Sequence, residues 1–188
     1  IGLPERYADH FFLADYRYQR GISQVWSFAF EPVGAGFRLV DEHVFIGNVL
    51  ATDLAFGFDG RLFVSLFGAL DGDRQILVAE HPAVADDPRL GETARLVRAG
   101  FAHRSPEELV ALLAHPDQRI RLRAQFALAS RDDATPLAAA VRNPQAALRA
   151  RIHALWALGQ MGPEALRSGV GESLAWARDE APELRAQL

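Results

Sequence analysis

Apolar and polar residues alternate most regularly over residues 53–68, which read DLAFGFDGRLFVSLFG. The apolar positions fall at every second residue on either side of a short break: Leu54, Phe56 and Phe58, then Leu62, Val64 and Leu66. A period of two is typical of a strand that buries one face. The break contains Asp59-Gly60, which predicts a two-residue hairpin turn because Gly adopts a positive φ without strain. A hairpin this rich in Phe must pack against further sheet.

The same pattern predicts further strands on both sides of this hairpin. We expect them at residues 10–16, 22–30, 37–45 and 75–79. Short strands at such regular spacing favour a sandwich, a barrel or the blades of a propeller. Six strands suit one blade and part of a second, which leaves open sheet edges that another piece of protein must cover.

The second half of the chain predicts helices, because Ala, Leu and Arg dominate beyond about residue 105. Residues 93–99 already begin with a helical pattern. Ser105 is placed to cap the next helix, with Pro106 in its first turn. The segment 115–117, His-Pro-Asp, breaks that pattern, and a further helix resumes in the run IRLRAQFALAS.

A repeat of 30 residues relates two segments of this half. Five residues return in the same order: Arg121, Ala124, Phe126, Ala127 and Leu128 match Arg151, Ala154, Trp156, Ala157 and Leu158. Paired helices that repeat at this scale predict an α-solenoid, in which each unit buries its face against its neighbours. We expect such units to continue beyond Leu188. We also expect five large aromatic side chains to be buried: Trp26, Phe56, Phe63, Phe126 and Trp156.

Composition divides the chain in the same place. Ten of the twelve Phe and all three Tyr precede residue 80. The expected fold class is therefore α+β and multidomain, with antiparallel β-sheet over residues 1–80 and α-helical repeats over residues 92–188. A linker is expected at 81–91, where the chain is polar and carries Pro82 and Pro88.

The net charge, the absence of Cys and the lack of a long apolar run exclude several classes of function. The net charge of −4 gives no electrostatic reason to expect nucleic acid, and all twenty basic residues are Arg. The absence of Cys excludes disulfides, Cys-ligated zinc and covalently attached haem within these residues. No apolar run is long enough to span a membrane. Met161 is the single Met, and the first residues lack a signal-peptide pattern, so we expect a piece of a longer protein.

Three runs of the sequence resemble one bacterial family. LVDEHVFIGNVLATDLAFGFDGRLFVSLFG, residues 39–68, and FFLADYRYQRGISQVWSFAFEPVGAGF before it are similar to the last propeller strands of planctomycete-type membrane-bound or haem-binding dehydrogenases. RLVRAGFAHRSPEELVALLAHPDQRIRLRAQFALAS resembles the passage of that family into HEAT-type repeats. This order of propeller, linker and HEAT repeats covers nearly the whole chain. The family is similar to soluble quinoprotein sugar dehydrogenases, which bind pyrroloquinoline quinone (PQQ) and calcium on a six-bladed propeller.

The resemblance implies an oxidoreductase whose parent protein oxidises a sugar or alcohol with PQQ and calcium and passes electrons to a haem outside this chain. It also implies a periplasmic, exported or membrane-associated location. Two residues are candidates for cofactor binding. Arg17 ends the phrase LADYR, where the relatives place a basic residue near the cofactor. Thr52 lies, with Leu50, at a cofactor-facing strand end where the relatives use Arg. No catalytic or metal-ligating residue is carried over, so this chain alone is not expected to catalyse.

Two alternatives stay open at this point. Arg17 can be an ordinary Arg at a strand end, because a lone Arg carries little information. The chain can also be a non-catalytic scaffold, in which propeller strands and HEAT repeats hold the remainder of the parent chain and a protein partner.

Four other groups of polar residues need an interpretation. Residues 41–43, Asp-Glu-His, are expected to form a solvated strand end, because consecutive strand residues point to opposite faces and cannot all converge. Residues 71–73, Asp-Gly-Asp, are expected to form a plain turn rather than a calcium loop. His115 is expected to be structural, and His153 to lie on the exposed side of its helix. A row of Arg offers either a solvated helical face or a site for an acidic partner: Arg119, Arg123, Arg149 and Arg151.

Overall fold

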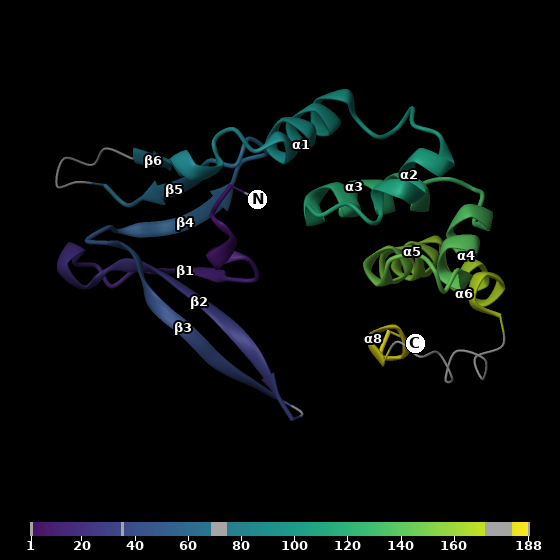
Figure 1. Cartoon of the computed structure of the whole chain (residues 1–188), viewed down its shortest axis with the longest axis horizontal. Helices are drawn as coiled ribbons and strands as arrows, with labels where there is room; N and C mark the ends of the chain where they lie inside the picture. The colour runs from purple at the N-terminus through teal and green to yellow at the C-terminus, as the bar shows by residue number, and fades with distance from the viewer. Residues whose placement is uncertain (1, 35, 69–74, 172–181, 188) are drawn as a thin grey trace. The chain divides into compact units, whose positions relative to one another are not determined.

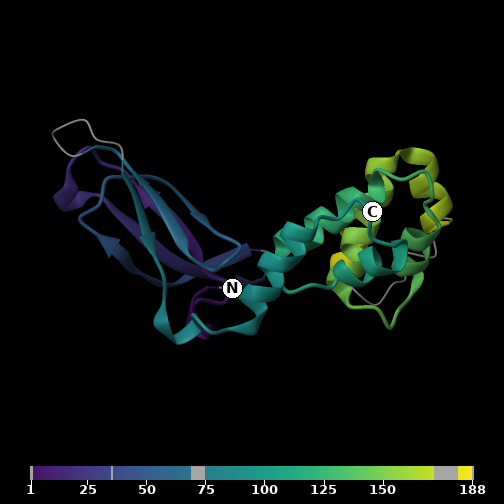
Figure 2. The ribbon, with the colours of Figure 1, turned by 90° about the horizontal axis from the view of Figure 1, so that it is seen from above.

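In the computed structural model of the chain, residues 2–34, 36–68, 75–171 and 182–187 are described (Figure 1, Figure 2). The chain divides into two compact units, residues 1–94 and 95–188. The first unit, called the β unit below, is built from antiparallel sheets, and the second, the helical unit, from α-helices. The α+β fold class is therefore confirmed. No helix among the described residues is both long and apolar enough to cross a membrane.

The β unit contains two sheets, each of three antiparallel strands in chain order. The first sheet comprises β1 (Phe11–Asp15), β2 (Gln24–Val33) and β3 (Gly36–Gly47), and the second β4 (Ala51–Phe56), β5 (Leu62–Leu66) and β6 (Gln75–Ala79). Short 3₁₀ helices precede β1 and β2: η1 (Glu5–Tyr7) and η2 (Arg20–Ile22). All six predicted strands are present, and β6 has the predicted bounds. The turn expected at 71–73 lies outside the described residues.

The loop of the hairpin between β4 and β5 differs from the prediction. The Gly57 amide donates to the Arg61 carbonyl at 2.8 Å, and the Gly60 amide donates to the Gly57 carbonyl at 3.2 Å. Three residues therefore separate the paired ends, and Gly60 has a φ of +80°, as in a turn that is followed by a left-handed residue. The predicted two-residue turn is wrong, and Phe58 belongs to the loop rather than to the strand. The positive φ of the Gly is confirmed.

The two sheets share a small aliphatic core. Its fully buried members are Val25, Ala51, Leu62 and Val64. Larger side chains pack around it, among them Phe12, Phe45 and Phe56. Trp26, Phe56 and Phe63 are only half-buried, short of the burial that the sequence predicted. The core thus leaves much of the aromatic content of the β unit in contact with water.

A bulge in β3 changes which side chains share a face of the first sheet. The pairing with β2 passes from Ala29↔Val40 to Ser27↔His43, so two residues of β3 stand opposite one residue of β2. One of the two is Asp41, whose φ is 49°. Asp tolerates this left-handed conformation better than most residues do. The bulge brings Asp41 into the neighbourhood of His43 on the same strand.

From α1 to α6 the helices follow one another with short connections (Figure 1). They are α1 (Pro88–Ala99), α2 (Pro106–Leu112), α3 (Gln118–Ala129), α4 (Thr135–Arg142), α5 (Leu148–Met161), α6 (Pro163–Val170) and α8 (Pro182–Arg185). The boundary between the two units falls within α1. The stretch 81–91, expected as a linker, contains a 3₁₀ helix, η3 (Pro82–Val84), and the first residues of α1.

Local capping signals place the helix ends where the sequence predicted. The Glu108 amide donates to Ser105 Oγ at 3.2 Å, and the Ser105 amide donates to the Glu108 carboxylate at 2.8 Å. This reciprocal capping box satisfies two amides that the first turn of α2 leaves free. Asp117 caps α3 by accepting the Arg119 amide at 2.8 Å. The predicted break at 115–117 is confirmed.

The helices α3 and α5 bury equivalent positions. Three pairs of residues 30 positions apart are buried: Arg121 and Arg151, Ala124 and Ala154, Leu128 and Leu158. They contribute to a hydrophobic core that draws buried side chains from α2 through α6 and from α8. Phe126 and Trp156, by contrast, are 53% and 41% exposed. The expectation that these two rings are buried is wrong, because Ala and Leu fill the buried stripe of each helix.

Candidate functional site

Arg17 follows β1 and pairs with the last residue of that strand. Its Nε donates to both carboxylate oxygens of Asp15, each at 2.9 Å. Asp15 also accepts a hydrogen bond from Trp26 Nε1 at 3.3 Å. The bond from Arg17 lowers the pKa of Asp15, against the opposing effect of partial desolvation and with help from Trp26. The Arg17 side chain stays 59% exposed and is therefore accessible to a ligand.

Thr52 lies on β4, in the other sheet. Its hydroxyl is 2.8 Å from Ser65 Oγ and donates to the Ser65 carbonyl at 3.2 Å. Arg17 and Thr52 are thus each engaged by a neighbour on their own sheet. No group of three His, Asp or Glu among the described residues is arranged to hold calcium. Cofactor binding by Arg17 and Thr52 stays a prediction from the resemblance.

Five residues gather around the bulge in β3, and we call them the polar cluster: Tyr7, His10, Ser27, Asp41 and His43. His10 Nδ1 is hydrogen-bonded to Ser27 Oγ at 2.7 Å, and His10 Nε2 lies 3.4 Å from Asp41 Oδ2. His43 Nδ1 donates to the Asp41 carbonyl at 2.9 Å. The ring of Tyr7 packs edge-on against His10, with ring centroids 5.5 Å apart.

The polar cluster is a buried structural feature rather than a nucleophilic site. It contains Ser, His and Asp, but Ser27 is 0% exposed and cannot reach a substrate. The His10 side chain is only 4% exposed. The expected solvation of residues 41–43 is confirmed for Asp41 and Glu42, which are exposed, while His43 is half-buried. The stretch lies within β3 rather than at its end, and the bulge brings the polar groups of Asp41 and His43 together. The cluster holds η1 and β1 against β2 and β3.

The other face of the first sheet carries eight apolar residues, which we call the outer aromatic face: Phe11, Leu13, Trp26, Phe28, Phe30, Phe37, Leu39 and Val44. Cross-strand pairing joins them in a continuous row, with Phe11 opposite Phe28, Leu13 opposite Trp26, Trp26 opposite Val44 and Phe30 opposite Leu39. The rings of the Phe residues contact one another in series, at centroid distances of 5.9, 5.4, 5.5 and 6.3 Å. The contacts cross all three strands.

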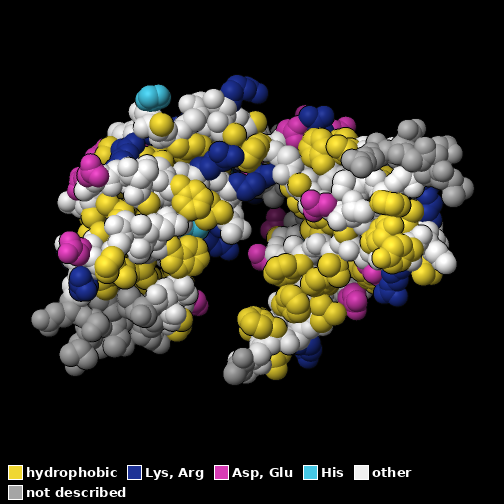
Figure 3. All heavy atoms as spheres, turned by 180° about the vertical axis from the view of Figure 1, so that it is seen from behind, with side chains coloured by type: hydrophobic (Ala, Val, Ile, Leu, Met, Phe, Trp, Pro, Cys, Tyr) yellow, Lys and Arg dark blue, Asp and Glu magenta, His cyan; other side chains and the backbone are white. Residues whose placement is uncertain are grey.

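The outer aromatic face is open to solvent. Phe37 is 74% exposed, Phe11 56% and Phe30 46%. Figure 3 shows hydrophobic side chains gathered along the β2–β3 ribbon. None of the eight residues is charged, and exposed apolar surfaces of this kind are typical of protein or membrane interaction sites and ligand-binding grooves. Sequence reasoning missed this site: the alternation of Phe28 and Phe30 was visible, but alternation alone does not tell which face meets the core.

His153 lies in a buried network that joins α3 to α5. Arg121 Nε donates to His153 Nε2 at 3.0 Å, and His153 Nδ1 lies 2.7 Å from Gln125 Oε1. Because a guanidinium only donates, Nε2 must accept, and the ring proton sits on Nδ1 and is donated to Gln125. Burial, and then the charge of Arg121, lowers the pKa of His153 below 6.5. The expectation that His153 lies on the exposed side of its helix is wrong.

Two Arg residues of the predicted row and repeat act inside the helical unit. Arg121 Nη1 donates to the carbonyls of His115 and the following residue, at 2.7 and 2.8 Å. Arg151, 30 residues on, donates to the Val141 carbonyl at 2.9 Å. His115 is buried and accepts the Asp117 amide at 3.0 Å through Nδ1, in keeping with its predicted structural role. Arg151 therefore does not belong to a solvated face.

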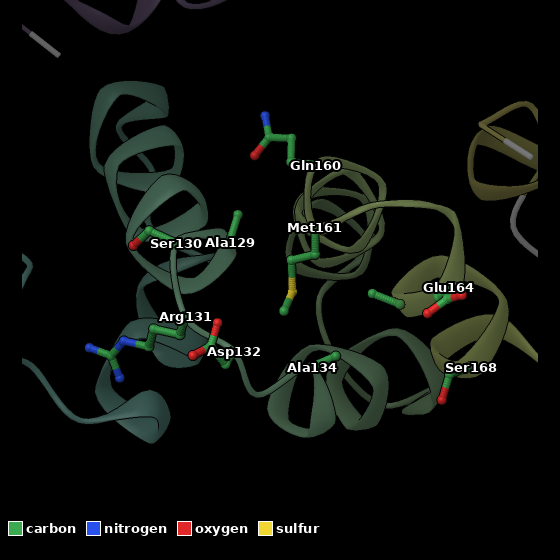
Figure 4. Close-up of a pocket in the computed structure, with 10 residues that line it drawn as sticks. Ala129, Ser130, Arg131, Asp132, Ala134, Gln160, Met161, Glu164 and Ser168 are labelled. Carbon is green, nitrogen blue, oxygen red and sulfur yellow. The ribbon is translucent and has the colours of Figure 1, made fainter.

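A groove of about 570 Å³ lies at the C-terminal ends of α3 and α5 (Figure 4). Met161 points into this groove, whereas Arg131 points away from it and donates to the carbonyls of Ala102 and Arg104. The groove is lined by two Ser but by no His, so it has no imidazole base to activate a hydroxyl. We assign no catalytic chemistry to it.

No family model, no curated protein and no solved structure matches this chain. Its function must therefore be argued from its own residues. Ser27 of the polar cluster is buried, and the groove lacks a catalytic pair. The exposed surfaces of the β unit and of the helical unit remain as the candidate functional sites.

Proposed function

We propose that this chain is a protein-interaction scaffold rather than a self-contained enzyme. The observation that carries the proposal is the outer aromatic face, where eight uncharged apolar side chains meet water on one side of a three-stranded sheet. In this proposal the strands belong to partial propeller blades, and the helices are HEAT-like repeats of an α-solenoid that presents a second binding surface.

The energetics favour a partner on the outer aromatic face. Removing a Phe side chain from water stabilises a complex by roughly 2–3 kcal/mol when the ring becomes fully buried. The row of rings offers several such contributions, and no charge on it has to be desolvated. We propose that the occupant is another β-sheet, such as a further blade of the same propeller, because two sheets pack face to face with interdigitating side chains.

Site-specific photo-crosslinking in the full-length parent protein tests this proposal. A photoreactive amino acid at Phe37, which is 74% exposed in this structure, should crosslink to another segment of the same polypeptide. The exposed Glu92 serves as the control position and should give no crosslink. A crosslink to a second copy would make the face a dimer interface instead. A folded protein without any crosslink at Phe37 would overturn the proposal.

A quinoprotein-type oxidoreductase is the second candidate, and Arg17 is the observation that favours it. Among the side-chain nitrogens of Arg17, only Nε takes part in hydrogen bonds in the described part of the chain, while the backbone amide donates to Ser23 Oγ. The two terminal nitrogens can therefore pair with a carboxylate, as PQQ would require. In this candidate the parent protein binds PQQ and calcium, carries haem elsewhere and is exported to the periplasm or the membrane.

Calorimetric titration of the full-length parent with PQQ and calcium separates the two candidates. The variant Arg17→Ala should weaken binding about tenfold or more, on the order of the loss of one charge-assisted pair. Arg20→Ala, at an exposed Arg of η2, is the matched control and should leave binding unchanged. A folded parent that binds no PQQ would leave the scaffold proposal standing alone.

A further inference from the structure

The charge of α3 and α5 differs from that of the chain as a whole. The chain has a net charge of −4, yet these two helices contain five Arg and no Asp or Glu. Arg121 and Arg151 are buried and bonded to backbone carbonyls, which do not neutralise a charge. Positive charge is therefore concentrated on two helices that contact each other directly.

Half-buried and exposed residues of the two helices fall at equivalent positions, and Arg119 is the half-buried one. Arg119 and Phe126 on α3 correspond to Arg149 and Trp156 on α5, each 30 residues further on. Arg149 is exposed, and Phe126 and Trp156 are 53% and 41% exposed. We call these four residues and Arg123, which is also exposed, the basic–aromatic face. Figure 3 shows Arg side chains beside hydrophobic ones on the helical unit.

The carboxylate of Asp117, at the start of α3, already pairs with a residue of the same helix. Asp117 accepts hydrogen bonds from the amide and the guanidinium of Arg119. Burial alone would raise the pKa of Asp117, but these bonds hold it below its usual value. Burial, and then the charge of Arg149, lowers the pKa of Arg121. Arg149 makes no ion pair within the described residues.

We infer that the basic–aromatic face binds an acidic segment of a partner protein that also carries apolar side chains. Carboxylates of such a segment can pair with the planar guanidinium groups. Its apolar side chains can pack on Phe126 and Trp156, the types of residue that anchor many interfaces. The inference rests on the proposed scaffold function and names the class of partner for the helical surface.

Nucleic acid is the competing polyanion, and the charges disfavour it. A nucleic-acid site normally spans many phosphates and belongs to a basic protein. Here only two Arg of the face, Arg123 and Arg149, are exposed, Arg119 is half-buried against Asp117, and the whole chain is acidic. Two exposed rings on neighbouring helices also match apolar side chains better than they match a phosphate backbone.

Fluorescence anisotropy with the whole 188-residue chain tests the inference. The probe is a labelled peptide in which Glu alternates with Leu and Phe, and the control probe replaces every Glu by Lys. The acidic peptide should bind, and binding should weaken as salt rises. Arg149→Glu should weaken it at least about tenfold and Trp156→Ala several-fold. Arg167→Glu reverses an exposed charge on α6 and should change nothing.

Three results would overturn the inference. They are equal binding of the basic peptide, an undiminished affinity of a folded Arg149→Glu variant, and tighter binding of single-stranded DNA than of the acidic peptide. Circular dichroism of each variant shows whether it is folded. A crosslink at Phe37 together with no peptide binding would overturn this inference while leaving the scaffold proposal intact.

Discussion

The β unit holds ten of the twelve Phe residues, yet among the described residues its fully buried cluster consists of four aliphatic residues, whereas the hydrophobic core of the helical unit contains fourteen. Twelve of the fourteen large apolar side chains that are exposed among the described residues lie in the β unit. The helical unit exposes two, Phe126 and Trp156. The β unit thus has the richer aromatic content and the smaller core.

The difference shows that a unit rich in apolar residues does not necessarily bury them in a core of its own. The Ala and Leu stripes of α3 and α5 allow the helices to approach closely and to bury their own surface. The three-stranded first sheet has two faces, and one of them has no partner among the described residues of the β unit. The helical unit should therefore resist unfolding by itself, while the surface of the β unit is suited to association.

The largest expected effect concerns the helical core. Leu128 is 1% exposed, so Leu128→Ala should lower the free energy of unfolding by about 3 kcal/mol, through lost burial and the cavity left behind. Leu39→Ala, at a residue that is 44% exposed on the outer aromatic face, is the matched control and should cost far less. Urea unfolding followed by circular dichroism measures both. Equal losses would mean that the two units do not differ in the way described.

A smaller effect is expected in the polar cluster. Ser27→Ala removes the partner of His10 Nδ1 in a fully buried site and should cost about 1–2 kcal/mol. Thr52→Ala removes an exposed hydroxyl that bonds to Ser65 and should cost about 0.5 kcal/mol or less. Near-ultraviolet circular dichroism during unfolding reports on the aromatic β unit. If Ser27→Ala were neutral, the cluster would not stabilise the sheet.

The helical unit should also lose stability in acid because of His153. Its folded pKa lies below the ordinary value of about 6.5. The unfolded chain therefore binds more protons in this range, and the stabilisation is complete above about pH 6.5 and is lost as pH falls through the lower folded value. His153→Gln should be less stable at pH 7.5 but should lose less between pH 7.5 and 5. Parallel pH profiles for the two proteins would exclude this role.

The smallest effect on stability is expected on the outer aromatic face. Phe30 is 46% exposed, so Phe30→Ser should change the free energy of unfolding by no more than about 0.5 kcal/mol. The same change should reduce the binding of a hydrophobic dye and any self-association in sedimentation experiments. A variant that loses stability but keeps its dye binding would place Phe30 in the core instead.

Local signals allowed much of the fold to be predicted. The strands follow from alternation, and the start of α2 follows from Ser105, Pro106 and Glu108, which act within one turn. The equivalence of α3 and α5 follows from the repeat. The hairpin loop was mispredicted by one residue, because the pair Asp59-Gly60 fits both a two-residue turn and the second half of a longer one.

Non-local contacts account for the rest. His153 was assigned to the exposed side because it aligns with Arg123, but Arg121 and Gln125 on the neighbouring helix provide buried partners that no local pattern reveals. Asp41 meets His10 through the bulge, which depends on the pairing of β3 with β2. The outer aromatic face was missed because alternation shows only that a strand has an apolar face. Packing decides which of two apolar faces forms the core.

The bulge at Asp41 also bears on how this stretch can change in evolution. It sets the register of the long β2–β3 ribbon, and a shift of one residue moves every side chain of a strand to the opposite face. A point substitution in the ribbon alters one position on one surface. Insertion or deletion of a single codon between the bulge and Phe37 would break the aromatic row, because β3 residues on one side of the change would turn to the opposite face while Phe11, Phe28 and Phe30 keep theirs. This ribbon should therefore diverge by exchange of residues while its length stays constant.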